Sequence, residues 1–350
     1  MDTGFRSRPE ARYAPPLPAP GGPLSSLVLK TIAAPPGKFK LGHQDAETLR
    51  QMGQRMDDPL SDHDLQLSLS LCYELHYLSF RGVETAWEWD PGLLGLRAEF
   101  EQLFIRGIGH AIGFEPDVRP DELGSRLLSL GRDRQYEDLV DLIAHDIDLE
   151  QTRELVIHRS PVRLRRPDPY GWAMTRLRGR PRRALAKLLE NAIPERSLYS
   201  KAMRAVGLDS RDGAYLDLLP GSTLAEINLM SFLGFHRRGR AAMLGQIAMQ
   251  EILSPAEDRA CGQALRRLGF GDDACAYFDR TAADARQVTS SAVFEMAEGQ
   301  ARIDPAFGRD IILGARSMLA VQERVVDRML DCWRRGKPSL LPERPVGQSG

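Results

Sequence analysis

The sequence predicts an all-α protein, and three observations carry that prediction. Apolar residues recur at intervals of three and four along several segments, which is the spacing that lines one face of a helix. No stretch alternates β-branched with polar residues as a half-buried strand does. The pair Asp212-Gly213, a possible hairpin turn, has no strand pattern on either side. We therefore expect a bundle of helices without a sheet.

Three segments show the helical pattern most clearly. The first runs from Asp62 to Phe80, the second covers residues 223–252 and the third covers residues 308–335. The second segment follows Gly221-Ser222, and we expect it to end at Ser254-Pro255 because proline interrupts a helix.

The two ends of the chain differ in composition from the rest. Proline, glycine and serine fill much of residues 9–36, and such a stretch is not expected to form a helix or to pack into a core. We predict a flexible leader over residues 1–40 and a flexible tail over 336–350. A proline-rich ligand for an aromatic groove is the alternative for the leader. Between the ends we expect an N-terminal helical region, 41–150, and a helical bundle, 151–335.

Charge, cysteine and histidine content exclude several classes of protein. Lys+Arg 47 against Asp+Glu 48 gives a net charge of -1, so the chain has no overall attraction to nucleic acid or to anionic membranes. The 4 cysteines and 7 histidines lie far apart, which excludes zinc fingers, zinc ribbons and a disulfide framework. We see no basic start followed by an apolar stretch and no membrane-spanning run, and we expect a cytoplasmic protein. Any metal site must be rich in carboxylates from distant segments.

The middle of the chain carries an unusual density of arginine. Residues 159–187 contain nine Arg, one Lys and a single acidic residue, Asp168. We interpret the segment as a solvated face that the acidic residues of 133–154 partly neutralise. The alternative is an anion or nucleic-acid site. Tyr170 and Trp172 are its only candidates for stacking on bases, so nucleic acid is not expected as a partner.

No catalytic motif stands out from the residues alone. The chain lacks a phosphate-binding glycine loop, a nucleophile elbow and a His-Glu-x-x-His motif. Glu74 and His76 lie two residues apart, so on a helix they point to different faces and cannot bind one ion. His158 and His236 each stand beside arginine, which lowers their value as metal ligands. The residues alone therefore identify no catalytic group.

Several short segments nevertheless occur in a characteristic order. They are YELHY (73–77), WEWDP (87–91), HRS (158–160), DPYGWAMTRLRGRP (168–181), LPGSTLAEINLMSFLGFHRRGR (219–240), GQIAMQE (245–251), LRRLGF (265–270) and YFDR (277–280). Together they resemble, over roughly residues 62–335, the iron-containing redox enzymes, which are haem-oxygenase-like diiron oxidases often found in bacterial natural-product pathways. The resemblance implies a haem-oxygenase-like helical bundle with an N-terminal helical extension, commonly as a homodimer.

The resemblance also implies a metal site and, with it, a set of ligand positions. Carboxylates and imidazoles from several helices of the family hold two irons that activate dioxygen. Glu251 in GQIAMQE is the one matching ligand in this chain. We find other residues at the remaining ligand positions, namely Arg166 and Ala192 in place of glutamates, and Thr281, Ala285 and Val288 in place of a His-x3-Asp-x2-His set.

A shift in the alignment to the family would place other residues at some of these ligand positions. Glu190 or Glu195 compensates for Ala192 if the alignment slips, and a shift by one residue brings Asp284 and Gln287 into the last ligand helix. Even then no imidazole is gained.

A single inward carboxylate needs compensation in such a bundle. Burying it is costly unless it is protonated, hydrogen-bonded or paired. We therefore expect Arg166, or another arginine from 163 to 166, to pair with Glu251 and to replace part of the charge that iron would neutralise. The alternative is that Arg166 lies exposed in a loop and that Glu251 is solvated.

The function we favour is a pseudoenzyme, a divergent family member that has lost its diiron site and acts as a non-catalytic partner subunit or scaffold. It would hold no cofactor and would form a homodimer or a heterodimer with an intact family member; a small-molecule ligand is also considered. One alternative is an active iron-dependent oxidoreductase with rearranged ligands. Another, by fold analogy, is a cofactor-independent enzyme in the same cavity. The rearranged ligands would come from Glu74, His76, His158, Glu251 and Asp284.

Overall fold

The computed structural model describes residues 17–75, 83, 85–112, 118–132, 136–177, 179–236, 241–284 and 289–342. These ranges fold into α-helices and one short 3-10 helix, and they contain no strand, which confirms the all-α class. None of the described helices is both long and apolar enough to cross a membrane.

The helices follow one another along the whole described chain. They are α1 (Pro23–Ala33), α2 (His43–Gln54), α3 (His63–Glu74), η1 (Thr85–Trp89), α4 (Pro91–Ala111), α5 (Leu123–Arg132), α6 (Glu137–His145), α7 (Leu149–Leu164), α8 (Pro167–Met174), α9 (Gly179–Ala205), α10 (Gly221–Phe235), α11 (Ala242–Arg267), α12 (Asp272–Asp284), α13 (Thr289–Ile303) and α14 (Ala306–Arg334).

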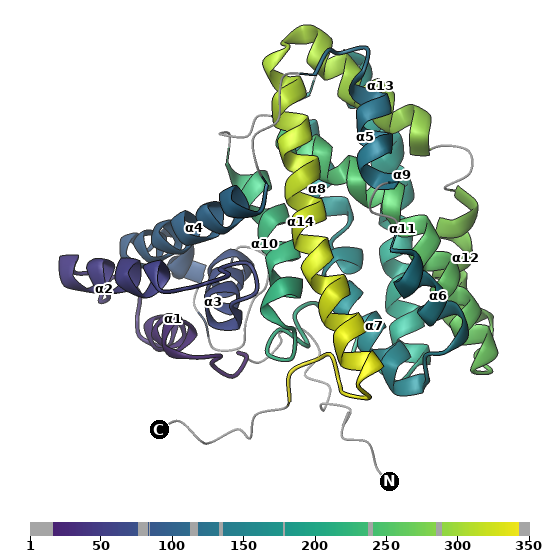
Figure 1. Ribbon diagram of the computed structural model, residues 1–350. Coiled ribbons are helices and arrows are strands. Elements are labelled where there is room, and N and C mark those ends of the chain that lie inside the picture. Colours follow the sequence, from purple (N-terminus) through teal and green to yellow (C-terminus); the bar gives the residue numbers. More distant parts are fainter. Residues whose placement is uncertain are drawn as a thin grey trace.

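The long helix α14 runs through the middle of the molecule (Figure 1). Helices α1–α4 lie on one side of it, whereas α5, α6, α9 and α11–α13 lie on the other. One hydrophobic core joins the two sides, with Leu65 of α3, Leu224 of α10, Ile247 of α11 and Val321 of α14 all fully buried. The core therefore continues across residue 150, where we had expected two helical regions to meet.

Helices α11 and α14 pack with their backbones in close contact because each contributes a glycine to the crossing. A Cβ atom on Gly245 would lie 1.8 Å from the carbonyl oxygen of Ile311. A Cβ atom on Gly314 would lie 1.8 Å from the carbonyl oxygen of Ala242. Any other residue at either position would force the helices apart, so these two glycines set the distance between the central helices.

The prediction of one helix over residues 223–252 was wrong in its bounds. The segment forms two helices, α10 and α11, and the residues between them include 237–240, which lie outside the described chain. Helix α11 does not end at Ser254-Pro255 but continues to Arg267. A proline inside a helix removes one N–H and frees one carbonyl, and packing on α14 and α12 outweighs that loss.

The prediction of a flexible leader was wrong for residues 23–33, which form α1. Pro23 occupies the first turn, where proline is tolerated because its missing N–H has no helical partner in any case. The Asp64 carboxylate of α3 accepts hydrogen bonds from the backbone N–H groups of Leu24 (2.7 Å) and Ser25 (2.8 Å). Leu24, Val28 and Ile32 are buried against the core. Tertiary packing thus orders a segment whose composition is typical of a linker.

The first part of the predicted tail is also packed. Ser339 is fully buried, and its N–H donates to the Glu154 carboxylate over 2.9 Å. The N–H of Leu341 donates to the carbonyl of Leu218 over 2.8 Å. Residues 343–350 lie outside the described chain.

We predict that Gly314→Ala destabilises the protein by about 1–3 kcal/mol, because the added methyl group overpacks the α11–α14 crossing. The control is Gly109→Ala on α4, where nothing lies within 4 Å of the added Cβ. That variant should be neutral or more stable by about 0.5–1 kcal/mol, the usual gain from replacing a helical glycine. Urea unfolding measures both, and equal stability of Gly314→Ala and the wild type would contradict the close crossing.

Candidate functional site

Arginines from α7 and the residues directly after it point into the bundle. Arg159, Arg163 and Arg165 are only 5–6% exposed, and the Arg166 side chain is 11% exposed. Positions 159, 163 and 166 recur at helical spacing, so they share one face of the chain at this point. The expectation of a solvated, self-neutralised face was therefore wrong for this part of 159–187. The ion-pair partners of these three residues come from α9, α10 and α11, and not from residues 133–154.

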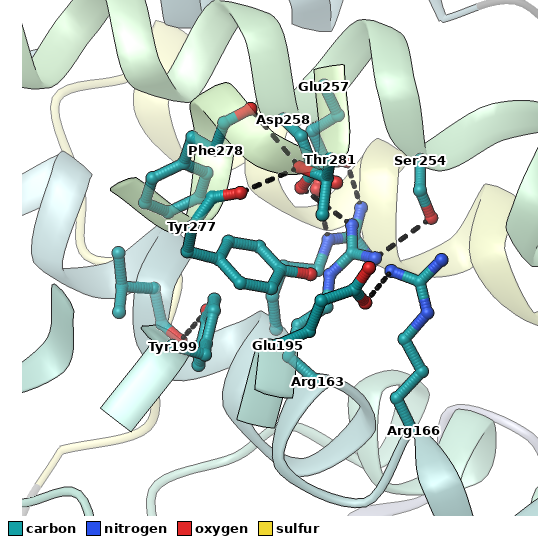
Figure 2. Close-up of polar contacts among 12 residues, drawn as sticks. Arg163, Arg166, Glu195, Tyr199, Ser254, Glu257, Asp258, Tyr277, Phe278 and Thr281 are labelled. Atoms are coloured by element: carbon teal, nitrogen blue, oxygen red, sulfur yellow. Dashed lines mark hydrogen bonds and ion pairs between the residues drawn. The ribbon is translucent and has the colours of Figure 1, made fainter. Parts of the chain in front are cut away.

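Arg166 links two carboxylates from different helices. Its Nη2 donates to Oε1 of Glu251 on α11 over 2.6 Å, and its Nη1 lies 3.0 Å from Oε2 of Glu195 on α9. Tyr170 of α8 completes the group, since its hydroxyl donates to Glu251 and accepts from Arg166 Nε over 3.2 Å. The predicted Arg166–Glu251 pair is thus confirmed, and Figure 2 shows Arg166 facing Glu195 across the interior.

Arg163 makes a second set of contacts beside the first. Its Nη2 donates to Oδ1 of Asp258 over 2.8 Å, and its Nη1 donates to Oγ of Ser254 over 3.0 Å. The Tyr277 ring of α12 lies against this guanidinium, 5.8 Å from ring centre to Cζ (Figure 2). Three sides of the cation are therefore covered by two helices.

Arg159, one turn before Arg163 on α7, binds a second pair of carboxylates. Its Nε and Nη2 donate to the two oxygens of Glu257 over 2.7 and 2.5 Å, which is the bidentate geometry that favours Arg–carboxylate pairs. Nη1 lies 3.4 Å from Oε2 of Glu226 on α10. We call Arg159, Arg163, Arg166 and their acidic partners the arginine network; the partners are Glu195, Glu226, Glu251, Glu257 and Asp258.

The arginine network holds more carboxyl groups than guanidinium groups, and this excess affects proton affinity. Burial raises the pKa of Glu195, of Glu226 and of Asp258, because the charged form loses hydration. The facing arginines act in the opposite direction, but the neighbouring carboxylates oppose them. These three carboxyl groups therefore bind a proton more readily than exposed carboxyl groups do.

The residues at this place fit a guanidinium–carboxylate network and do not fit a pair of iron ions. Glu195, Glu251 and Asp258 each already bind an arginine. Within the described ranges, no group of three or more His, Cys, Asp or Glu side chains is arranged to hold a metal ion.

The structure places several predicted ligand positions without a ligating group. Ala192 is 1% exposed on α9, and the Thr281 hydroxyl donates to the carbonyl of Tyr277 over 3.1 Å. Ala285 and Val288 lie outside the described residues. The loss of the family's metal site stays a prediction.

Among the described residues, the rearranged ligands Glu74, His158 and Glu251 do not form a group that could hold a metal ion. Glu74 pairs with Arg165, and both ring nitrogens of His158 are engaged, Nδ1 with Thr223 Oγ1 (2.7 Å) and Nε2 with Ser339 Oγ (3.0 Å). His76 and Gln287 lie outside the described chain, and Asp284 is the last residue of α12.

Sequence reasoning missed Glu195 and Asp258 as partners in the network. Glu195 lies three residues beyond Ala192, where the alignment had placed the missing carboxylate. Asp258 follows Glu251 by seven residues, a spacing that keeps both on one helix face. For Asp258, this signal was present in the sequence but was hidden by the assumption that the helix ends at Pro255.

We predict that Arg166→Met destabilises the protein by about 3–5 kcal/mol at pH 7, because it leaves Glu195 and Glu251 buried without their cation. Burial already raises the pKa of Glu195 and Arg166 opposes that rise, so without Arg166 the folded chain takes up a proton at Glu195 more readily than the unfolded chain does. The loss of unfolding free energy relative to the wild type should therefore become smaller as the pH is lowered towards 5.

The matched control for this variant is Arg50→Met, which breaks the exposed Arg50–Glu99 pair (2.8 Å). An exposed pair contributes about 0–1 kcal/mol, so this variant should show a small and pH-independent change. Denaturant unfolding at several pH values measures both variants. A loss in Arg166→Met no larger than in Arg50→Met would contradict a buried network.

We predict that His158 makes the fold sensitive to acid. Burial lowers its pKa to about 3, whereas an unfolded histidine titrates near about 6.5. Below pH ~6.5 the unfolded chain binds a proton at this histidine, whereas the folded chain does not. The free energy of unfolding therefore falls by about 1.4 kcal/mol per pH unit until the pH approaches 3. His158→Gln should flatten this slope, and His110→Gln at an exposed position should not. Equal slopes in the two variants would show that His158 titrates normally.

Comparison with known proteins agrees with this architecture. Residues 153–323 match the family described as iron-containing redox enzyme, a range that runs from α7 to α14 and contains the whole arginine network. None of the curated proteins compared with the chain matches it. Over residues 153–323, just under half of its length, the chain is thus similar to the iron-containing redox enzyme family.

Proposed function

We propose that this chain is a divergent member of the iron-containing redox enzyme family that has lost its diiron site and acts as a non-catalytic partner subunit or scaffold. The observation that carries the proposal is the Arg166 guanidinium between Glu195 and Glu251. A cation that is part of the chain holds the carboxylates that would otherwise be open to metal. The bundle can then keep its inward acidic residues without a cofactor.

The electrostatics of the site support the loss of iron chemistry. A second guanidinium, that of Arg163, lies beside the first and binds Asp258. Two fixed positive charges repel a divalent cation at short range, and a buried environment screens that repulsion weakly. An arriving iron ion would have to displace both arginines into the apolar core, at a cost typical of breaking a buried pair.

The role as a partner subunit rests on the family resemblance, because haem-oxygenase-like bundles commonly pair through helix faces. We propose a homodimer or a heterodimer with an intact family member in the cytoplasm. Pairing of two copies by a twofold axis would use the same surface on each subunit. The chain would contribute shape and stability to the assembly, and the intact member would contribute any iron chemistry.

The experiment that tests the loss of iron is anaerobic loading with Fe(II), removal of unbound metal by gel filtration and measurement of iron per chain by mass spectrometry. An intact family member treated in parallel shows that the loading works. We expect this chain to retain far less than one iron. Retention of one or two irons per chain would contradict the proposal and would favour the iron-dependent oxidoreductase.

The same samples test the partner role. Light scattering after gel filtration gives the mass of the chain alone and after mixing with an intact family member from the same genome. We expect a mass of two chains in at least one of the two samples. A single-chain mass in both would contradict the subunit role, and turnover by the metal-free chain would favour a cofactor-independent enzyme.

A further inference from the structure

A groove lies between α6 and α11, and Glu257 is the one residue of the arginine network that lines it. Its volume is about 480 Å³, which falls in the range of small-molecule sites. We call it the α6–α11 groove. Its apolar walls are formed by Leu139, Val140 and Ala144 from α6 and by Ile252, Leu253 and Ala260 from α11.

Two buried polar side chains line this otherwise apolar groove. Glu257 is 9% exposed and belongs to the arginine network, and Gln322 of α14 is 7% exposed. The side-chain carbonyl oxygen of Gln322 is buried and accepts no hydrogen bond from the described residues. A buried acceptor without a donor costs about 1–3 kcal/mol. A ligand that donates a hydrogen bond at this point would remove that cost.

The charge around the groove is negative. Glu257 shares Arg159 with Glu226, so two carboxyl groups face one guanidinium. At the rim, Glu137 and Asp141 are exposed acidic residues, with Arg259 as a basic neighbour and with His145 Nδ1 lying 3.1 Å from Asp141 Oδ1. A cationic group near Glu257 would balance the uncompensated charge, whereas an anionic group would add to it.

We propose that the α6–α11 groove binds a small amphiphilic amine, with its hydrocarbon part against the apolar walls and its ammonium group near Glu257 and Gln322. An ammonium group carries three donors and no acceptor, which matches a carboxylate beside an acceptor without a donor. This inference goes beyond the proposed function and does not depend on it, because the groove lies outside the Arg166 contacts. Loss of iron and binding of an amine can therefore be tested separately.

The test is isothermal titration calorimetry of the full chain with three probes of equal chain length: octylammonium, 1-octanol and octanoate. We expect one octylammonium per chain, affinity at least about tenfold lower for octanol, and no binding of octanoate, because only the first satisfies both polar groups. Absence of saturable octylammonium binding, or equal binding of octanoate, would overturn the proposal.

Variants locate the binding in the groove. Ala256→Trp fills it from α11, and Gln322→Leu removes the buried acceptor. Each should weaken octylammonium binding about tenfold or more, whereas Ala283→Trp on the exposed side of α12 should not change it. The double variant Glu137→Gln, Asp141→Asn changes only exposed rim residues and should lower affinity several-fold, even if Ala256→Trp does not fold. Wild-type affinity in the double variant and in Gln322→Leu would overturn the proposal.

Discussion

The centre of this bundle depends on the ion pairs that the Arg166 guanidinium makes with Glu195 and Glu251. This guanidinium joins α9 to α11 through Glu195 and Glu251, while Tyr170 ties the same group to α8. Each of these carboxyl groups would be costly to bury alone. One planar cation with several donors in fixed directions satisfies them together, which a flexible lysine ammonium would do less well. The bundle can thus close around these acidic residues because a side chain of the protein itself supplies the positive charge.

The same contact shows how a helical bundle can hold several carboxyl groups in its interior. Carboxylates that point inward need a positive charge nearby, and either a metal ion or a basic side chain can supply it. Here α7 and its C-terminal end supply arginines at helical spacing, so several cations face the interior from one segment. A buried ion pair of this kind is weak evidence for high stability, since well-packed apolar residues often do as well. Its effect is to fix which helices lie together, because a mispaired arginine would leave buried charges on both sides.

The close crossing of α11 and α14 provides the frame that holds the acidic residues in register. Gly245 and Gly314 let the two backbones touch, and α11 carries Glu251, Glu257 and Asp258 on the turns that follow. The continuation of α11 through Pro255 matters here, because it keeps these carboxylates on one rigid element. The groove on the other side of α11 then shares Glu257 with the network. One helix therefore separates a closed charged centre from an open apolar groove.

The sequence by itself determined the helical class, the resemblance to the family and the pairing of Glu251 with Arg166. These follow from local spacing and from the cost of burying a lone charge, and both can be read along the chain. Only the tertiary structure decided that Glu195 and Asp258 join the network, that the arginines of α7 are buried, that α11 passes through Pro255 and that residues 23–33 form a helix. Each of these depends on which helices pack together. Packing outweighs local propensity, because the free energy from burying a helix face exceeds the cost of one proline or one desolvated charge that finds its partner.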